Sequence, residues 1–346
     1  MAELTLAQQV LGRFFGKIAR PEALLGAPEL RERALEACGL ATQGSETFTL
    51  FVELPLAGPA GFDLHAYPLV THQEQRQPQA EEHIWQHWPQ TAPLFEWCAL
   101  QPACQAEAGY AFDLQSNPRA LQEPCLYTAF FTPEKGTVPQ SMALMQGECF
   151  DAALGRLLAA AQPEHSVYYT GVMHGRDPLV AHLGFKVAPQ LAQAYGQQPG
   201  LLSQHLQLMG FSAAGSALEG FEPFAAQGFA GDVQFAFDEH GPLEETLAFS
   251  LVPGGGAGAR AQRMRGGDIS QMLAFLQEQG LADARWRELL PAMGTWMLPC
   301  IVDDSVVPCV AGFGIGYVKF RWTDGRPAAP AKLYIELRAS LACKET

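Results

Sequence analysis

The sequence predicts an α+β protein in which ten antiparallel β-strands, from five α-β-β repeats, form a closed barrel inside an outer ring of helices. Three observations support this prediction: five segments alternate like β-hairpins, helical stretches lie between them, and the strands separate polar from apolar faces. A barrel is expected because closing a sheet made of hairpins removes its exposed edges. The same pattern also allows an open sheet whose polar face lies in bulk water.

The five hairpins define the repeats. Each consists of two alternating strands joined by residues that favour turns, such as Pro, Gly and Asp. The hairpins cover residues 48–69, 109–131, 165–187, 233–252 and 312–337. Their sequences are only weakly similar, so the repeat is one of pattern. We expect a single domain over residues 1–346, with an N-terminal helical segment at 1–45 and the repeats over 46–340.

Helical stretches separate the hairpins. Apolar residues spaced three to four apart predict helices over residues 4–40, 79–98, 149–162 and 189–209, and the first of these is interrupted near Pro21 and Pro28. Residues 268–292 predict a helix or helix pair with Asp268 as its N-cap. Helices outside a barrel contact the apolar faces of its strands. The polar faces are therefore expected to point into the barrel.

Strand alternation indicates which side chains share the interior. In the last strand, Lys332, Tyr334 and Glu336 alternate with Leu333 and Ile335. Applied to every hairpin, the same reasoning gives a large polar chamber. The candidate lining residues are Phe51, Glu53, Asp63, His65, Tyr67, Tyr127, Tyr168, His182, Lys186, Tyr317, Lys319, Arg321, Lys332, Tyr334 and Glu336.

The composition argues against several classes of function. The 346-residue chain has 36 acidic and 22 basic residues and a net charge of −14, which disfavours binding to nucleic acids and to anionic membranes. No apolar stretch is long enough to span a membrane, and the N-terminal residues resemble a helix more than an export signal. We therefore expect a cytoplasmic protein without membrane or nucleic-acid partners, either a monomer or a homodimer.

A ten-stranded antiparallel barrel with a polar interior, built from such repeats, resembles the ABBA-type prenyltransferase family. In size and hairpin pattern the chain is most similar to the peptide prenyltransferases of cyanobactin-type pathways. The segment AKLYIEL, with Lys332 and Tyr334 facing inward, resembles the Lys/Arg-x-Tyr strand with which that family binds diphosphate. The segment FTLFVELPL, with Glu53 facing inward, is similar to the family's first strand, which carries its acceptor-binding glutamate. The resemblance covers most of the chain.

This resemblance implies prenyl transfer from an allylic isoprenoid diphosphate to a peptide or small aromatic acceptor. Glu53 would orient and deprotonate the acceptor. The diphosphate would be bound by Lys186, Lys319, Arg321, Lys332, Tyr334 and His182. The residues that would shield the allylic cation or bind the acceptor are Phe51, Asp63, His65, Tyr67, Tyr127, Tyr168, Tyr317 and Glu336. Mg²⁺ bridging the diphosphate is compatible with this chemistry, although no dedicated metal site is predicted.

Departures from the family pattern leave two other functions open. That family places basic or tyrosine diphosphate ligands on most repeats, whereas the first hairpin here offers Asp63 and His65, and the fourth offers Thr246 and Ser250. One alternative is a peptide-modifying hydrolase or isomerase, in which Asp63, His65 and His182 perform acid–base or metal chemistry. The other is a non-catalytic barrel that binds a peptide or a small ligand, because a fold does not determine a function.

Overall fold

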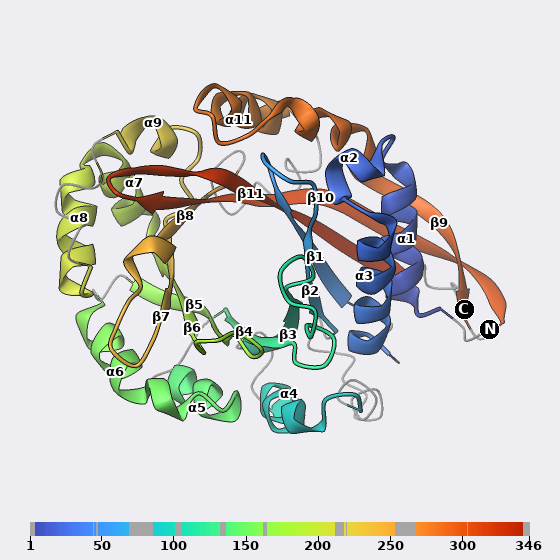
Figure 1. The fold of residues 1–346 in the computed structure, drawn as a ribbon, viewed down its shortest axis with the longest axis horizontal. Coiled ribbons are helices and arrows are strands. Elements are labelled where there is room, and N and C mark those ends of the chain that lie inside the picture. The colour runs from blue at the N-terminus through green and yellow to red at the C-terminus, as the bar shows by residue number, and fades with distance from the viewer. Residues whose placement is uncertain are drawn as a thin grey trace.

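The computed structural model describes residues 4–43, 45, 48–68, 86–100, 106–131, 136–161, 165–211, 218, 220–252, 267–302 and 304–341. Ten antiparallel strands close into a barrel that is surrounded by helices, as predicted (Figure 1). The strands are β1 (Phe48–Pro55), β2 (Asp63–Tyr67), β3 (Ala106–Phe112), β4 (Cys125–Phe130), β5 (His165–Val172), β6 (Ala181–Val187), β7 (Asp232–Phe237), β8 (Ala248–Leu251), β9 (Gly294–Val302), β10 (Ser305–Thr323) and β11 (Arg326–Leu341).

The barrel closes between the first and last repeats. Strands β1 to β7 each pair with the next strand in sequence, β8 pairs with β10, and β10 pairs with β11. Strand β11 then pairs along the whole of β1, which places Glu53 opposite Tyr334 and Pro55 opposite Lys332. This closure brings residues from the two ends of the sequence into one wall.

The helices cover the outside of the barrel, where the apolar faces of the strands lie. Leu50 and Val52 of β1 are fully buried on that side, and Phe14 packs edge-on against Phe313 with ring centroids 5.4 Å apart. The described helices are α1 (Leu6–Lys17), α2 (Pro21–Leu25), α3 (Pro28–Ala41), α4 (Ala92–Leu100), α5 (Thr137–Leu144), α6 (Asp151–Ala160), α7 (Pro189–Gln197), α8 (Pro199–Leu208), α9 (Glu222–Ala225) and α11 (Gly267–Glu278). None of them combines the length and apolar character needed to cross a membrane.

Several helices are shorter than the sequence pattern suggests, and proline accounts for most of the differences. Residues 4–40 form three helices, with Pro21 and Pro28 at the start of the second and third. Residues 189–209 form two helices, because Pro199 starts a new one after Gln198. The helix predicted over 268–292 begins at Gly267, so Asp268 is not its N-cap, and it is followed by 3₁₀ turns from Ala284 onward. The first part of the segment predicted over 79–98 lies outside the described residues.

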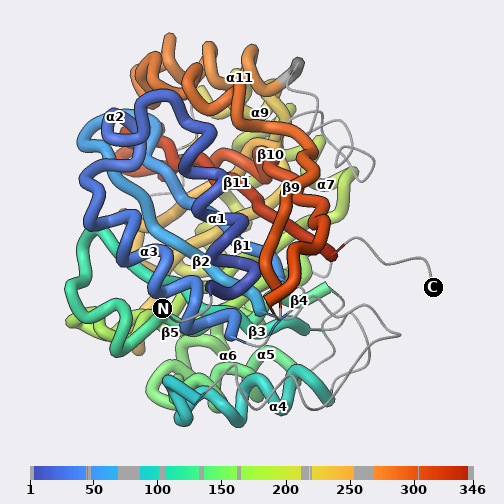
Figure 2. The backbone as a smooth tube through the Cα atoms, turned by 90° about the vertical axis from the view of Figure 1, so that its right-hand side faces the viewer, coloured from blue at the N-terminus to red at the C-terminus, as the bar shows by residue number. Residues whose placement is uncertain are grey.

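Strand β9 lies outside the ten-stranded ring. It pairs with residues 305–313 of β10, beyond the stretch of β10 that pairs with β8. This extension lies beside α1 (Figure 2). There the ammonium group of Lys17 lies 3.2 Å from the centroid of the Trp296 ring. The side-chain amide of Gln9 bonds the backbone of Ile301, and Pro299 lacks an N–H, so the outer edge of β9 is poorly suited to further pairing.

The hairpin turns lie at one end of the barrel, which we call the turn end. The segments that lead to helices lie at the opposite end, the helix end. This arrangement follows from the α-β-β order, since each hairpin runs from its helix to the turn and back. The turns follow β1, β3, β5, β7 and β10. Side chains from different turns can therefore meet at one end of the interior.

Candidate active site

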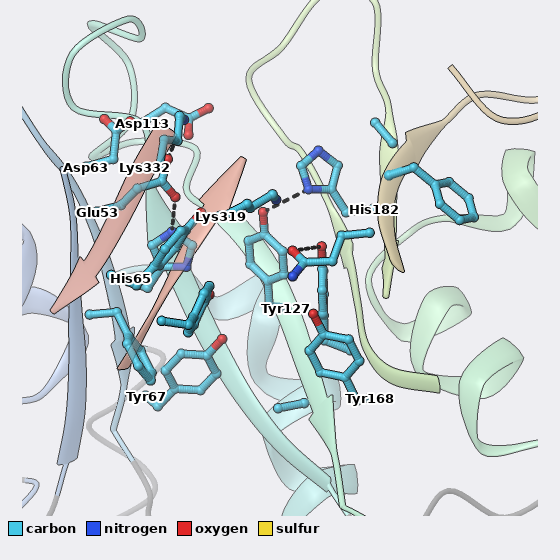
Figure 3. Close-up of a pocket in the computed structure, with 18 of the residues that line it drawn as sticks. Glu53, Asp63, His65, Tyr67, Asp113, Tyr127, Tyr168, His182, Lys319 and Lys332 are labelled. Carbon is cyan, nitrogen blue, oxygen red and sulfur yellow. Dashed lines mark hydrogen bonds and ion pairs between the residues drawn. The ribbon is translucent and has the colours of Figure 1, made fainter. Parts of the chain in front are cut away.

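A cavity of about 500 Å³ occupies the barrel, and its walls carry most of the side chains that strand alternation predicts for the interior (Figure 3). Of the fifteen candidates, thirteen line it: Phe51, Glu53, Asp63, His65, Tyr67, Tyr127, Tyr168, His182, Tyr317, Lys319, Arg321, Lys332 and Tyr334. They come from β1, β2, β4, β5, β6, β10 and β11, so the cavity joins residues from across the sequence.

The other two candidates do not line the cavity. Lys186 lies near the helix end of β6 with an exposed side chain, and its ammonium group is 5.3 Å from the centroid of the Tyr168 ring. Glu336 is ion-paired with Arg338, and it is the arginine that contributes to the lining. Both residues have the predicted parity on their strands. Position along the barrel, which alternation does not encode, separates Lys186 from the other candidates. Glu336 lies between two lining residues of β11, Tyr334 and Arg338, and its carboxylate is paired with the arginine.

Glu53 is the centre of a charged cluster at the turn end. Its carboxylate forms an ion pair with the Lys332 ammonium, and its Oε2 lies 3.3 Å from Nε2 of His65. Burial alone would raise the pKa of Glu53, but the charge of Lys332 and the hydrogen bond from His65 hold that pKa well below its usual value. Glu53 is therefore an ionised carboxylate inside a closed barrel.

Two further carboxylates lie close to this cluster. Asp63 is directly opposite Glu53 in the pairing of β1 with β2, and burial together with the Glu53 charge raises the pKa of Asp63 to about 6. Asp113, just after β3, accepts a hydrogen bond from Nε of Arg176 at 2.7 Å. Arg176 belongs to the turn between β5 and β6. The turn end thus combines three acids with two basic partners.

The cations that line the cavity fall into two groups. Arg176, Lys332 and Arg338 are each paired with a carboxylate. Lys319 and Arg321, on the same face of β10, have no ion pair among the residues that the structure describes. Burial lowers the pKa of Lys319 to about 8. Figure 3 shows Lys319 extending into the cavity between the charged cluster and His182. These two residues are the ones most available to an anionic ligand.

Aromatic rings form much of the remaining wall. Tyr317 and Tyr334 stack with centroids 4.2 Å apart, and Phe51 packs edge-on against Tyr67 at 6.0 Å. Tyr127 lies 5.9 Å from Tyr169, a neighbour that alternation did not predict. Burial raises the pKa of each phenol in this wall, so the hydroxyls remain protonated and can donate hydrogen bonds.

Several lining residues escaped the sequence analysis. Tyr169 follows Tyr168 directly, and strict alternation would direct it to the helices. A bulge between Val167 and Tyr169 turns both tyrosines toward the cavity. The adjacent aromatic pair was the only sequence signal available. Others lie in turns or were overlooked on correctly predicted strands, among them Glu107, Ser116, Arg176, Gln234 and Arg338.

The described residues contain no group of three or more His, Cys, Asp or Glu side chains arranged to hold a metal ion. Of the carboxylates at the turn end, Glu53 is bonded to Lys332 and Asp113 to Arg176. The set therefore does not fit a protein-bound Mg²⁺ ion, which prefers several carboxylate or water oxygens in an octahedron.

No protein-family model matches this sequence, and no curated protein matches it. Solved structures do match its fold. AnaPT from Neosartorya fischeri superposes with a TM-score of 0.52 at 10% identity, covering 96% of this chain and 94% of that one. The 5-dimethylallyltryptophan synthase from Streptomyces coelicolor gives 0.50 at 13% identity, covering 97% and 98%.

The NotF prenyltransferase gives a TM-score of 0.52 at 10% identity, with 99% of this chain and 97% of that chain covered. This chain has the prenyltransferase-barrel fold. The match extends over nearly the full length of each partner, so the barrel and its surrounding helices are shared as one architecture. At these identities the similarity concerns the fold, and the activity has to be argued from the cavity.

Proposed function

We propose that this protein transfers a prenyl group from an allylic isoprenoid diphosphate to a peptide or small aromatic acceptor. One observation carries the proposal: a cavity inside the barrel, walled by aromatic rings, holds an ionised carboxylate, Glu53, together with two cations, Lys319 and Arg321, that have no ion pair among the described residues. The names of the matching structures, which include a dimethylallyltryptophan synthase, support the same reaction class.

The first step would be ionisation of the donor. The bond between the allylic carbon and the diphosphate oxygen breaks, and the electron pair leaves with the diphosphate. Lys319 and Arg321 would neutralise this developing charge. Electrostatic stabilisation of a leaving group is strong in a site from which water is excluded.

The allylic cation would then be held against the aromatic wall. The faces of aromatic rings carry partial negative charge and attract cations, while the rings exclude water that would otherwise capture the cation. Tyr67, Tyr168, Tyr169 and Tyr317 surround the helix-end part of the cavity for this purpose. Wild-type enzyme should therefore give little prenyl alcohol.

Glu53 would orient the acceptor by accepting a hydrogen bond from it. Attack of the acceptor on the cation forms the new bond and leaves a proton to be removed. Asp63, cross-strand from Glu53 and with its pKa raised to about 6, suits the role of proton acceptor better than Glu53, whose pKa is low. No step of this proposal is routed through Mg²⁺.

The test is an incubation with dimethylallyl or geranyl diphosphate and a panel of peptides and free aromatic amino acids. We expect an acceptor to gain the mass of one prenyl group and diphosphate to be released in equal amount. Glu123→Gln, which changes an exposed pair with Arg119, neither residue of which lines the cavity, is the matched control for Glu53→Gln. Absence of any prenylated product, together with no donor consumption, would reject the proposal.

A second candidate is a barrel that binds a ligand without transferring a prenyl group. Its support is that three of the five cations lining the cavity are already paired with carboxylates. Calorimetric titration with a non-hydrolysable thiolodiphosphate analogue of the donor distinguishes prenyl transfer from this second candidate function. Prenyl transfer requires saturable binding that Lys319→Met weakens, whereas the second candidate predicts no binding of the analogue.

A further inference from the structure

Asp232 is a buried carboxylate that lies behind the aromatic wall and does not itself line the cavity. It is the first residue of β7 and is 3% exposed. Its Oδ1 accepts from the backbone N–H of Ser250 at 2.8 Å, and its Oδ2 accepts from the Tyr168 hydroxyl at 3.0 Å and from the Gln234 amide. A carboxyl group that accepts at both oxygens is in the arrangement expected of the ionised form.

Gln234 extends this network to the second tyrosine. Its Nε2 donates to Oγ of Ser250 at 2.7 Å as well as to Asp232, which fixes the orientation of the amide. Its Oε1 is then free to accept from the Tyr169 hydroxyl at 3.3 Å. Asp232 therefore fixes the position of the Tyr168 hydroxyl directly, and that of the Tyr169 hydroxyl through the side-chain amide of Gln234.

The backbone makes room for this tyrosine pair. The bulge in β5 turns Tyr168 and Tyr169 to the same side, and the cross-strand partner of Tyr169 is Gly184. A Cβ atom at Gly184 would lie 2.3 Å from the Tyr169 ring and 2.8 Å from the Tyr168 ring. Both rings thus pack against β6 at Gly184, which has no side chain, and their hydroxyls are hydrogen-bonded to Asp232 and Gln234 of β7.

We propose that Asp232 is a positioning residue that fixes Tyr168 and Tyr169 and places a buried negative charge behind their rings, so that this wall holds the cationic carbon of the donor. The inference rests on the proposed function and deepens it. A phenol that donates to a carboxylate has a more electron-rich ring, which strengthens its attraction for cations. A cation is already associated with this ring, since Lys186 Nζ lies 5.3 Å from the Tyr168 centroid.

The first test compares Asp232→Asn with Asp238→Asn in the prenyl-transfer assay. Asp238 lies just after β7, and within the described part of the chain its side chain accepts only from backbone N–H groups of its own turn, so it controls for loss of a carboxylate near the same strand. We expect Asp232→Asn to lower kcat about tenfold with a smaller change in KM for the donor, and to raise the share of prenyl alcohol. Asp238→Asn should match wild type in both.

Tyr168→Phe keeps the proposal testable if Asp232→Asn fails to fold. It retains the ring and removes only the hydroxyl that contacts Asp232. The same rise in prenyl alcohol is expected in this variant. Unchanged product ratios in both folded variants would overturn the proposal.

The second test does not depend on prenyl transfer. Dimethylallylammonium, a stable cation with the shape of the allylic cation, is titrated into wild type, Asp232→Asn and Asp238→Asn. We expect affinity to fall about tenfold in Asp232→Asn alone. That result in a protein without transferase activity would reject the proposed function and retain the cation site. If the protein transfers prenyl groups but all three proteins bind dimethylallylammonium with equal affinity, the proposed function would be retained and the role of Asp232 rejected.

Discussion

At the scale of single residues, burial and neighbouring charges give similar groups in the site different pKa values. Glu53 and Asp63 are carboxylates on adjacent strands, directly opposite each other. The pKa of Glu53 is lowered by Lys332 and His65, while the pKa of Asp63 is raised by burial and by Glu53. Two acids with different proton affinities can separate acceptor binding from proton removal.

Glu53→Gln should reduce prenyl transfer by about a hundredfold or more, because the amide cannot provide the negative charge that orients the acceptor. Donor binding should change little. Steady-state kinetics and a thermal melt check this prediction, with Glu123→Gln as control. A variant that keeps wild-type kcat and KM would show that Glu53 serves only to neutralise Lys332.

The pH dependence of kcat/KM should have two limbs. Lys319 has a pKa lowered to about 8, so its positive charge is lost as the pH rises through 8, and donor capture weakens above that value. Asp63 has a pKa raised to about 6, so it can accept a proton only above that value. Activity should therefore be greatest between about pH 6 and 8.

Lys319→Arg provides the control for the upper limb. A guanidinium stays charged throughout this range, so kcat/KM of the variant should no longer decline above pH 8. If kcat/KM of Lys319→Arg still declines above pH 8, the decline is caused by the titration of a group other than Lys319.

At the scale of secondary-structure elements, one bulge and one glycine shape the tyrosine wall. Gly184→Ala would place a Cβ against Tyr169, which is bonded to Gln234 and cannot move freely. We expect the free energy of unfolding to fall by about 1–3 kcal/mol and prenyl alcohol to increase. Gly155→Ala is the matched control, because nothing lies within 4 Å of its added Cβ in α6, and it should stabilise the protein by about 0.5–1 kcal/mol. Equal stability of the two variants, measured by urea denaturation, would contradict this packing.

The elements that sequence reasoning missed share a physical cause. Strand β9, which contains Trp296 and Pro299, was left unassigned, because its alternation is broken by proline and its partner is the unusually long β10. Helix α5 is short and weakly amphipathic, so its residues carry little periodic signal. The bulge at Tyr169 has no local signature beyond the adjacent aromatic pair Tyr168 and Tyr169. Each of these features is determined by partners distant in sequence.

At the scale of the whole molecule, the separation of polar and apolar strand faces predicted most of the lining of the barrel, although the same pattern also allowed an open sheet. The prediction succeeded because a period of two assigns each residue to a face whatever its partner is. It could not show which lysines are paired, since the pairing of Lys332 with Glu53 depends on the closure of β11 against β1. Lys186 has the expected parity and still lies outside the cavity lining, because height along the barrel is a property of the assembled ring.

The most direct measurement is a crystal structure of the protein with a thiolodiphosphate donor analogue and a peptide or aromatic acceptor. We predict the diphosphate against Lys319 and Arg321 near the turn end, the prenyl chain along Tyr168 and Tyr169, and the acceptor within hydrogen-bonding distance of Glu53. A structure at saturating analogue in which the barrel contains only water, or in which the analogue binds outside the barrel, would contradict the assignment of this cavity as a prenyl-transfer site.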